Sequence, residues 1–143
     1  MATSNAATNY LERRILDFIF KNNALSFASP GNSLYVGLAT AVSAAETGSL
    51  TEATFTNYAR KQVTAANWTT IGADSTDTQT AKNAANIEFA ASGGTNNTIS
   101  HVFVADASTG GNILFVGALD VSKLIADGDI FRINTGNLTI ELK

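Results

Sequence analysis

The sequence predicts a single, mainly β domain: an antiparallel β-sandwich of about seven to eight strands with one N-terminal α-helix. Apolar residues recur at helical spacing near the N-terminus, and further along the chain they alternate with polar residues instead. Clusters of Gly, Asn and Asp separate the alternating segments, as turns do between short strands. Because 143 residues is near the commonest domain size, we expect one folded unit at residues 9–143.

The helix is predicted at residues 9–23, after a flexible arm at residues 1–8 that is small, polar and has little to bury. Four apolar residues share one helical face: Leu11, Ile15, Phe18 and Ile19. Asn9 is the predicted N-cap, and Glu12 follows it at the spacing of a capping box. Asn22 and Asn23 supply a left-handed end. Three more residues widen the apolar surface, so we expect this helix to contact both its own domain and a neighbour: Tyr10, Leu16 and Phe20.

Strand patterns begin after a turn signal at residues 29–32. The predicted strands are residues 34–39, 60–66, 68–71, 84–90, 99–105, 112–118, 130–135 and 138–143. The strongest apolar run, residues 99–105, is predicted to be a central strand that forms a hairpin with residues 112–118. Residues 42–56 and 72–83 are predicted as polar loops. The first of these is long enough to indicate a functional loop or one held by a partner.

The composition excludes several classes of function. Only 15% of the residues are charged, against about 25% in an average soluble domain. Such a surface suits permanent packing against partners, and it also suits many secreted β proteins. A net charge of −3, with Lys and Arg scattered along the chain, argues against a nucleic-acid partner. The absence of Cys rules out disulfides, thiolate zinc sites and cysteine nucleophiles.

Membrane insertion and export are not indicated either. No apolar run approaches the 18 or so residues that a membrane-spanning helix needs. The first residues lack both the basic patch and the apolar run of a signal peptide, so we expect synthesis in a cytoplasm.

The sequence contains no credible catalytic or cofactor centre, and we predict a protein that is not an enzyme. The single histidine, His101, lies in the central strand pattern and is interpreted as structural. A triad would need Ser100 or Ser108 together with Asp106, and it fails because neighbours on one strand alternate faces. Two pairs of acids are interpreted as turn residues rather than as metal ligands: Asp74 with Asp77, and Asp127 with Asp129.

Several aromatic and basic residues are candidates for an interface with another subunit. They are Tyr10, Arg14, Phe20, Phe55, Tyr58, Arg60 and Trp68. Core packing explains most of the aromatic residues, but aromatics exposed near the predicted 42–56 loop would be anchors for a partner. Arg60 is at a position to pair with an acid across a subunit boundary. The competing interpretation is a carbohydrate-binding β-sandwich, with Trp68 or Tyr58 exposed in a flat row.

Two sequence pieces carry a family resemblance: residues 57–60, Asn-Tyr-Ala-Arg, and residues 106–112, which have the pattern Asp-x-x-x-Gly-Gly-Asn. With the helix and the strands between them, from about residue 10 onward, they resemble small virion proteins of tailed bacteriophages, which are labelled tail-fibre or decoration proteins. The resemblance implies a particle component and supplies no catalytic residues. Residues 69–82 are longer and more polar than that group leads us to expect.

The resemblance and the composition lead to a hypothesis for function. The main hypothesis is a capsid cement or decoration protein that stabilises the shell through many weak contacts. The alternative is a tail or tail-fibre component. The expected partners are the major capsid protein or tail proteins, together with further copies of this chain, and a trimer is one option. The expected location is the virion, after synthesis in the host bacterial cytoplasm.

Overall fold

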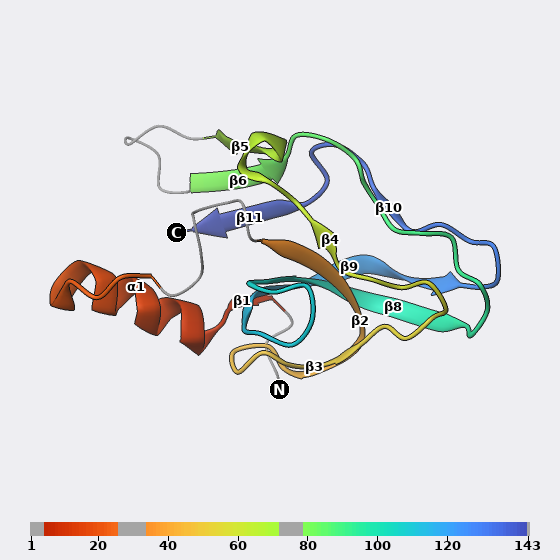
Figure 1. Ribbon diagram of the computed structural model, residues 1–143, viewed down its shortest axis with the longest axis horizontal. Coiled ribbons are helices and arrows are strands. Elements are labelled where there is room, and N and C mark those ends of the chain that lie inside the picture. Colours follow the sequence, from red (N-terminus) through yellow and green to blue (C-terminus); the bar gives the residue numbers. More distant parts are fainter. Residues whose placement is uncertain (1–4, 26–33, 72–78, 143) are drawn as a thin grey trace.

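The computed structural model describes residues 5–25, 34–71 and 79–142, and it confirms a mainly β fold with antiparallel strands and one α-helix (Figure 1). The elements in chain order are β1 (Ala6–Ala7), α1 (Asn9–Lys21), β2 (Tyr35–Ala44), β3 (Ser49–Glu52), β4 (Lys61–Gln62), the 3₁₀ turn η1 (Ala65–Asn67), β5 (Trp68–Ile71), β6 (Gln79–Asn83), β7 (Ile87–Glu88), β8 (Asn97–Ala105), β9 (Ile113–Ile125), β10 (Arg132–Ile133) and β11 (Thr139–Leu142).

The larger sheet has the order β1-β9-β8-β2-β3, with β4 paired to one end of β2. Strand β8 lies at its centre, as the apolar run predicted, and it forms the expected antiparallel hairpin with β9. Side chains alternate along β8, so Val102 and Val104 enter one core cluster while Phe103 and Ala105 enter another on the opposite face. Both faces of the sheet are therefore buried around β8.

A second layer covers one face of this sheet. It contains the three-stranded sheet β11-β6-β5 and the short pair β10-β7 (Figure 1). The main core lies between the layers and includes a chain of aromatic contacts, in which Phe55 meets Tyr58 edge-on, Tyr58 stacks on Phe89, and Phe89 meets Phe131 edge-on. This packing accounts for the sandwich-like arrangement.

The N-terminal region differs from the sequence prediction in two ways. Residues 5–8, predicted to belong to a flexible arm, are held on β9: Ala6 and Ala7 pair with it, and the Asn5 side-chain oxygen accepts a 2.6 Å hydrogen bond from the amide of Ala118. Residues 1–4 lie outside the described part of the chain. The N-cap of α1 is Thr8 rather than Asn9.

A tertiary contact explains the choice of N-cap. The Thr8 hydroxyl donates to the carbonyl of Ile113 on β9 at 2.6 Å and accepts from the amide of Leu11 at 3.4 Å, so docking on the sheet and capping use the same side chain. At the other end, Asn22 adopts the left-handed conformation with φ 54°, which confirms the predicted stop.

The predicted long loop at residues 42–56 was wrong, because β2 continues to Ala44 and forms a hairpin with β3. Small residues concealed this strand: Val42 and Ala44 are half-buried while Ala41 and Ser43 are exposed, an alternation with little contrast in hydrophobicity. Other strand boundaries shift as well. Residues 60–66 reduce to β4 and η1, β9 extends to residue 125, β7 and β10 are two residues each, and the polar segment 72–83 ends in β6. Residues 72–78, which include Asp74 and Asp77, lie outside the described part.

Candidate functional site

The two sequence pieces that carried the family resemblance meet in the structure through Arg60. Its guanidinium donates to both carboxylate oxygens of Glu52 at 2.8 Å, from Nε to Oε1 and from Nη2 to Oε2. Its third nitrogen, Nη1, donates to the backbone carbonyls of Ala107 and Gly110, each at 2.8 Å. A planar guanidinium is the side chain suited to this combination, since it presents several donors in a fixed fork.

The surroundings of Arg60 are largely closed to solvent. Its side chain is 5% exposed and that of Glu52 is 32% exposed. The guanidinium carbon lies 5.0 Å from the centre of the Phe103 ring, and the Tyr58 hydroxyl donates to Glu52 at 2.8 Å while accepting from the amide of Leu38 at 3.0 Å. We call Arg60, Glu52 and Tyr58 the Arg60 network.

The ionisation of this network follows from its contacts. Burial raises the pKa of Glu52, but hydrogen bonds from Arg60 and Tyr58 and the charge of Arg60 outweigh it, so the net shift is downward. The hydrogen bond to Glu52 raises the pKa of Arg60, despite the opposing effect of burial. Burial is the main cause that raises the pKa of Tyr58. Glu52 and Arg60 thus form a stable ion pair, and Tyr58 stays protonated.

The Arg60 network fixes the shape of the loop between β8 and β9. Within that loop Asp106 accepts hydrogen bonds from the backbone amide of Asn112 at 2.7 Å and from its side-chain amide at 2.8 Å. Gly110 and Gly111 have φ of 60° and 68°, a left-handed conformation that glycine adopts more readily than residues with a Cβ. Both sequence pieces therefore have a role in the architecture of this loop.

Four of the predicted interface residues lie inside this architecture or beside it. Phe55 is 2% exposed in the core, and Tyr58 and Arg60 belong to the Arg60 network. Arg60 pairs with Glu52 of its own chain, so the predicted pairing across a subunit boundary is replaced by an internal one. Trp68 is half-buried against the core and donates from its ring nitrogen to the carbonyl of Val63 at 3.3 Å. These positions form no flat exposed row of the kind a carbohydrate-binding surface uses.

The other three predicted residues lie on α1, whose far half is strongly exposed. Leu11 in the first turns is 4% exposed, whereas later apolar side chains lie largely in solvent. These are Leu16 (55% exposed), Phe18 (53%), Ile19 (60%) and Phe20 (78%), and we call them the exposed end of α1. Figure 1 shows α1 running outward from the β-layers. An exposed apolar cluster of this kind is typical of a surface that binds another protein or a membrane.

The remaining two predicted residues lie closer to the start of α1. The guanidinium carbon of Arg14 lies 5.2 Å from the centre of the Tyr10 ring, a cation–π contact within the helix. The structure thus places Phe20 in the exposed cluster and keeps Tyr10 and Arg14 beside it. The exposure of Leu16 agrees with the expectation that it widens the apolar surface toward a neighbour, whereas Phe18 and Ile19 were assigned by helical spacing to the face that covers the domain and are exposed instead.

His101 contacts its neighbour Ser100, contrary to the expectation from strand alternation. The Ser100 hydroxyl and His101 Nδ1 are 2.7 Å apart, at a point where the pairing of β8 with β9 is irregular. The Ser100 hydroxyl also donates to the carbonyl of Thr40 at 3.0 Å, so His101 Nδ1 is the donor between the two side chains. A histidine that donates to the serine cannot take its proton, and burial lowers the pKa of His101. The contact is structural.

The described part of the chain contains no candidate metal cluster and no candidate membrane-spanning helix. No group of three or more His, Asp or Glu side chains there could hold a metal ion. Asp129 instead accepts a hydrogen bond from the amide of Ala126 at 3.0 Å and so caps a turn, as predicted. None of the helices described is both long and apolar enough to cross a membrane.

Comparison with known proteins identifies one matching family. The family described as Podophage GP4 fiber I protein gp80 matches residues 6–141, which is nearly the whole chain. No curated protein matches the sequence significantly.

Proposed function

The chain belongs to the family of the Podophage GP4 fiber I protein gp80, and from this premise we propose that it is a non-enzymatic structural component of a podophage tail fibre. A member of this family is a structural protein of a tailed-phage virion. The observation that supports assembly as its function is the exposed end of α1, where four large apolar side chains are more than half exposed.

Further features support a structural role. The donors of Arg60 are taken up by Glu52 and by two carbonyls of the β8–β9 loop, and this stabilisation of the loop supports a structural role for the Arg60 network. The Ser100–His101 contact has a donor and acceptor arrangement unsuited to activating a nucleophile. Only 15% of the residues in the sequence are charged, and a low content of charged residues lowers the free energy needed to bring a surface against other subunits.

The family favours the tail-fibre alternative over capsid decoration. A fibre component is present in a small number of copies, whereas a decoration protein covers the shell. We therefore expect quantitative mass spectrometry of purified particles to give far fewer copies of this chain than of the major capsid protein. A copy number of the same order as that of the capsid protein would overturn the fibre proposal and restore decoration.

The exposed end of α1 gives a second test. We expect Phe20→Asp to fold normally, because Phe20 is 78% exposed, and to be lost from particles when it replaces the natural chain. Val121→Asp is the matched control, because Val121 is 79% exposed on β9 and lies outside the exposed end of α1. Equal incorporation of both variants would contradict the assignment of α1 as the attachment surface.

A further inference from the structure

We propose that Arg60 sets the direction in which α1 leaves the domain, because its guanidinium joins the two segments that hold the first turn of the helix. The inference rests on the proposed function, in which the exposed end of α1 is the attachment surface. In that function Arg60 is a positioning residue, since it determines where the attachment surface lies without belonging to it. The contacts at the base of α1 and those of Arg60 carry the inference.

The base of α1 is held by backbone groups of two segments. The first segment is the start of β9: the amide of Thr8 donates to the carbonyl of Leu114 at 2.9 Å, and the Thr8 hydroxyl donates to the carbonyl of Ile113 at 2.6 Å. The second segment is the turn between β2 and β3, where the carbonyl of Glu46 accepts from the amide of Asn9 at 2.8 Å. The direction of the helix therefore depends on how these two segments lie relative to each other.

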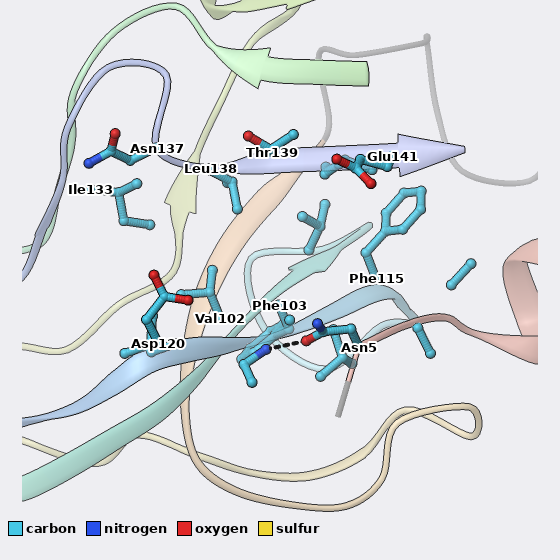
Figure 2. A pocket seen from close by; sticks show the side chains of 18 residues that line it. Asn5, Val102, Phe103, Phe115, Asp120, Ile133, Asn137, Leu138, Thr139 and Glu141 are labelled. Carbon is cyan, nitrogen blue, oxygen red and sulfur yellow. Dashed lines mark hydrogen bonds between the residues drawn. The ribbon is translucent and has the colours of Figure 1, made fainter. Parts of the chain in front are cut away.

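The chain that leads into α1 is itself fixed to the sheet. Strand β1 pairs with β9, and the Asn5 side-chain oxygen accepts from the amide of Ala118 at 2.6 Å, a hydrogen bond that is drawn as a dashed line in Figure 2. Because β1 is held in this way, a change in the direction of α1 has to occur at the junction between β1 and the helix, which is where Thr8 and Asn9 bind the two segments.

The two segments are packed closely where they meet the helix. Gly48, at the end of the β2–β3 turn, has φ of 69°, and a Cβ at this position would lie 3.0 Å from Ile113 Cβ and 3.6 Å from Thr8 Cγ2. The amide of Gly48 donates to the carbonyl of Ala45 at 2.9 Å, which closes the turn. In such close packing the turn cannot shift over the start of β9 without moving the base of the helix.

Arg60 joins the same two segments at a second point. It bonds both carboxylate oxygens of Glu52, the last residue of β3, and this four-residue strand directly follows the β2–β3 turn. It also donates to the carbonyls of Ala107 and Gly110 in the β8–β9 loop, whose end leads into the start of β9. One buried guanidinium therefore fixes the position of β3 relative to the loop.

The β8–β9 loop extends this restraint to the base of α1 because the loop is itself closed. Asp106 accepts from the backbone and side-chain amides of Asn112 at 2.7 and 2.8 Å, and the Asp106 amide donates to the Asn112 carbonyl at 3.1 Å. Asn112 directly precedes Ile113, whose carbonyl accepts from the Thr8 hydroxyl. A continuous set of contacts thus runs from Arg60 through the loop to the first turn of the helix.

Small changes at the base are enlarged at the exposed end of α1. The helix has 13 residues and is therefore about 20 Å long, so a tilt of about 10° at its base displaces its far end by about 3 Å. Loss of the Arg60 bonds should therefore displace the attachment surface, although the Arg60 side chain is buried and lies on a different part of the chain.

Distances between two spin labels measure the direction of α1, and the natural chain contains no Cys that would interfere with labelling. One label is attached at Ile19→Cys on the exposed end of α1, and the other at Thr98→Cys, which is exposed on β8 in the middle of the larger sheet. Pulsed electron–electron double resonance should give one narrow distance distribution for this labelled chain. Adding Arg60→Met should shift or widen the distribution by about 3 Å or more, whereas Arg132→Met, which removes an exposed ion pair, should leave it unchanged.

Two further variants separate the position of the helix from the stability of the fold. Phe131→Leu destabilises the main core beside β10, which lies across the molecule from α1 in Figure 1, and it should keep the narrow distribution. Asp106→Ala removes the side-chain bonds that close the β8–β9 loop and leaves the core intact, so it should widen the distribution as Arg60→Met does. This variant decides the question if Arg60→Met does not fold.

An unchanged distribution in folded Arg60→Met would overturn the inference, as would an unchanged one in Asp106→Ala if Arg60→Met does not fold. Equal widening in Phe131→Leu would also overturn it, because loss of stability alone would then release the helix. Incorporation of Phe20→Asp into particles tests the attachment surface separately. If the distance distributions stay unchanged while Phe20→Asp is lost from particles, the proposed function stands and only the role of Arg60 is refuted.

Discussion

Removing the guanidinium of Arg60 should be among the most damaging single changes to this fold outside its apolar core. Arg60→Met keeps the stem of the side chain but removes the four hydrogen bonds and leaves the Glu52 carboxylate without its counter-ion. Breaking a fully buried ion pair from one side costs about 3–5 kcal/mol. Glu52 is 32% exposed and can recruit water, so we expect a smaller loss of about 2–3 kcal/mol.

Chemical denaturation and thermal melting measure this loss. For a domain of this size, about 3 °C of melting temperature corresponds to 1 kcal/mol, so Arg60→Met should melt about 6–9 °C lower. The matched control is Arg132→Met. Arg132 donates to Glu88 at 2.6 Å, but the two side chains are 50% and 46% exposed. Exposed pairs of this kind contribute about 0.2–1 kcal/mol.

A comparable loss in both variants would refute the reasoning, because burial and the contacts to the β8–β9 loop would then carry no extra stability. Arg60→Lys separates charge from geometry: it keeps the positive charge and loses the paired hydrogen bonds, so it should lie between the natural chain and Arg60→Met. The double variant with Glu52→Gln should be less damaging than the sum of the single changes, because the two residues interact.

Two further predictions concern the same face of the larger sheet. The pKa of Glu52 is lowered in the folded chain, so the contribution of this residue to stability is present above the ordinary value of 4.5 and is lost as the pH falls through the folded value. In urea titrations between about pH 6 and 3, the free energy of unfolding should fall more steeply with decreasing pH for the natural chain than for Glu52→Gln. Equal slopes would contradict the lowered pKa of Glu52. Gly37→Ala should lower the melting temperature strongly, because a Cβ at this position overlaps the Phe103 ring. Gly117→Ala is the control and should melt like the natural chain, because the nearest atom to its added Cβ is the Asn5 side-chain oxygen at 3.9 Å. Similar melting temperatures for the two variants would be inconsistent with this packing.

The sequence predicted the elements whose burial pattern is strong and missed those whose pattern is weak. The β8–β9 hairpin was predicted because β-branched and aromatic residues fill it, and its polar turn is clear. Strand β6 was missed because its polar residues resemble a loop, and the second half of β2 because Ala and Ser differ too little in hydrophobicity. Alternation reveals a strand only when one of its faces is distinctly apolar.

Contacts between residues far apart in the sequence explain why the structure differs from the sequence predictions at Arg60, at the N-cap and on α1. Arg60 was singled out from the sequence, but its partners Ala107 and Gly110 are 47 and 50 residues away, and only the folded sheet brings them to the guanidinium. Thr8 and Asn9 are both suitable N-caps by residue type, and the carbonyl of Ile113 decides between them. The amphipathic pattern of α1 was visible, but how much of its apolar face the domain covers depends on where the helix leaves the sheet.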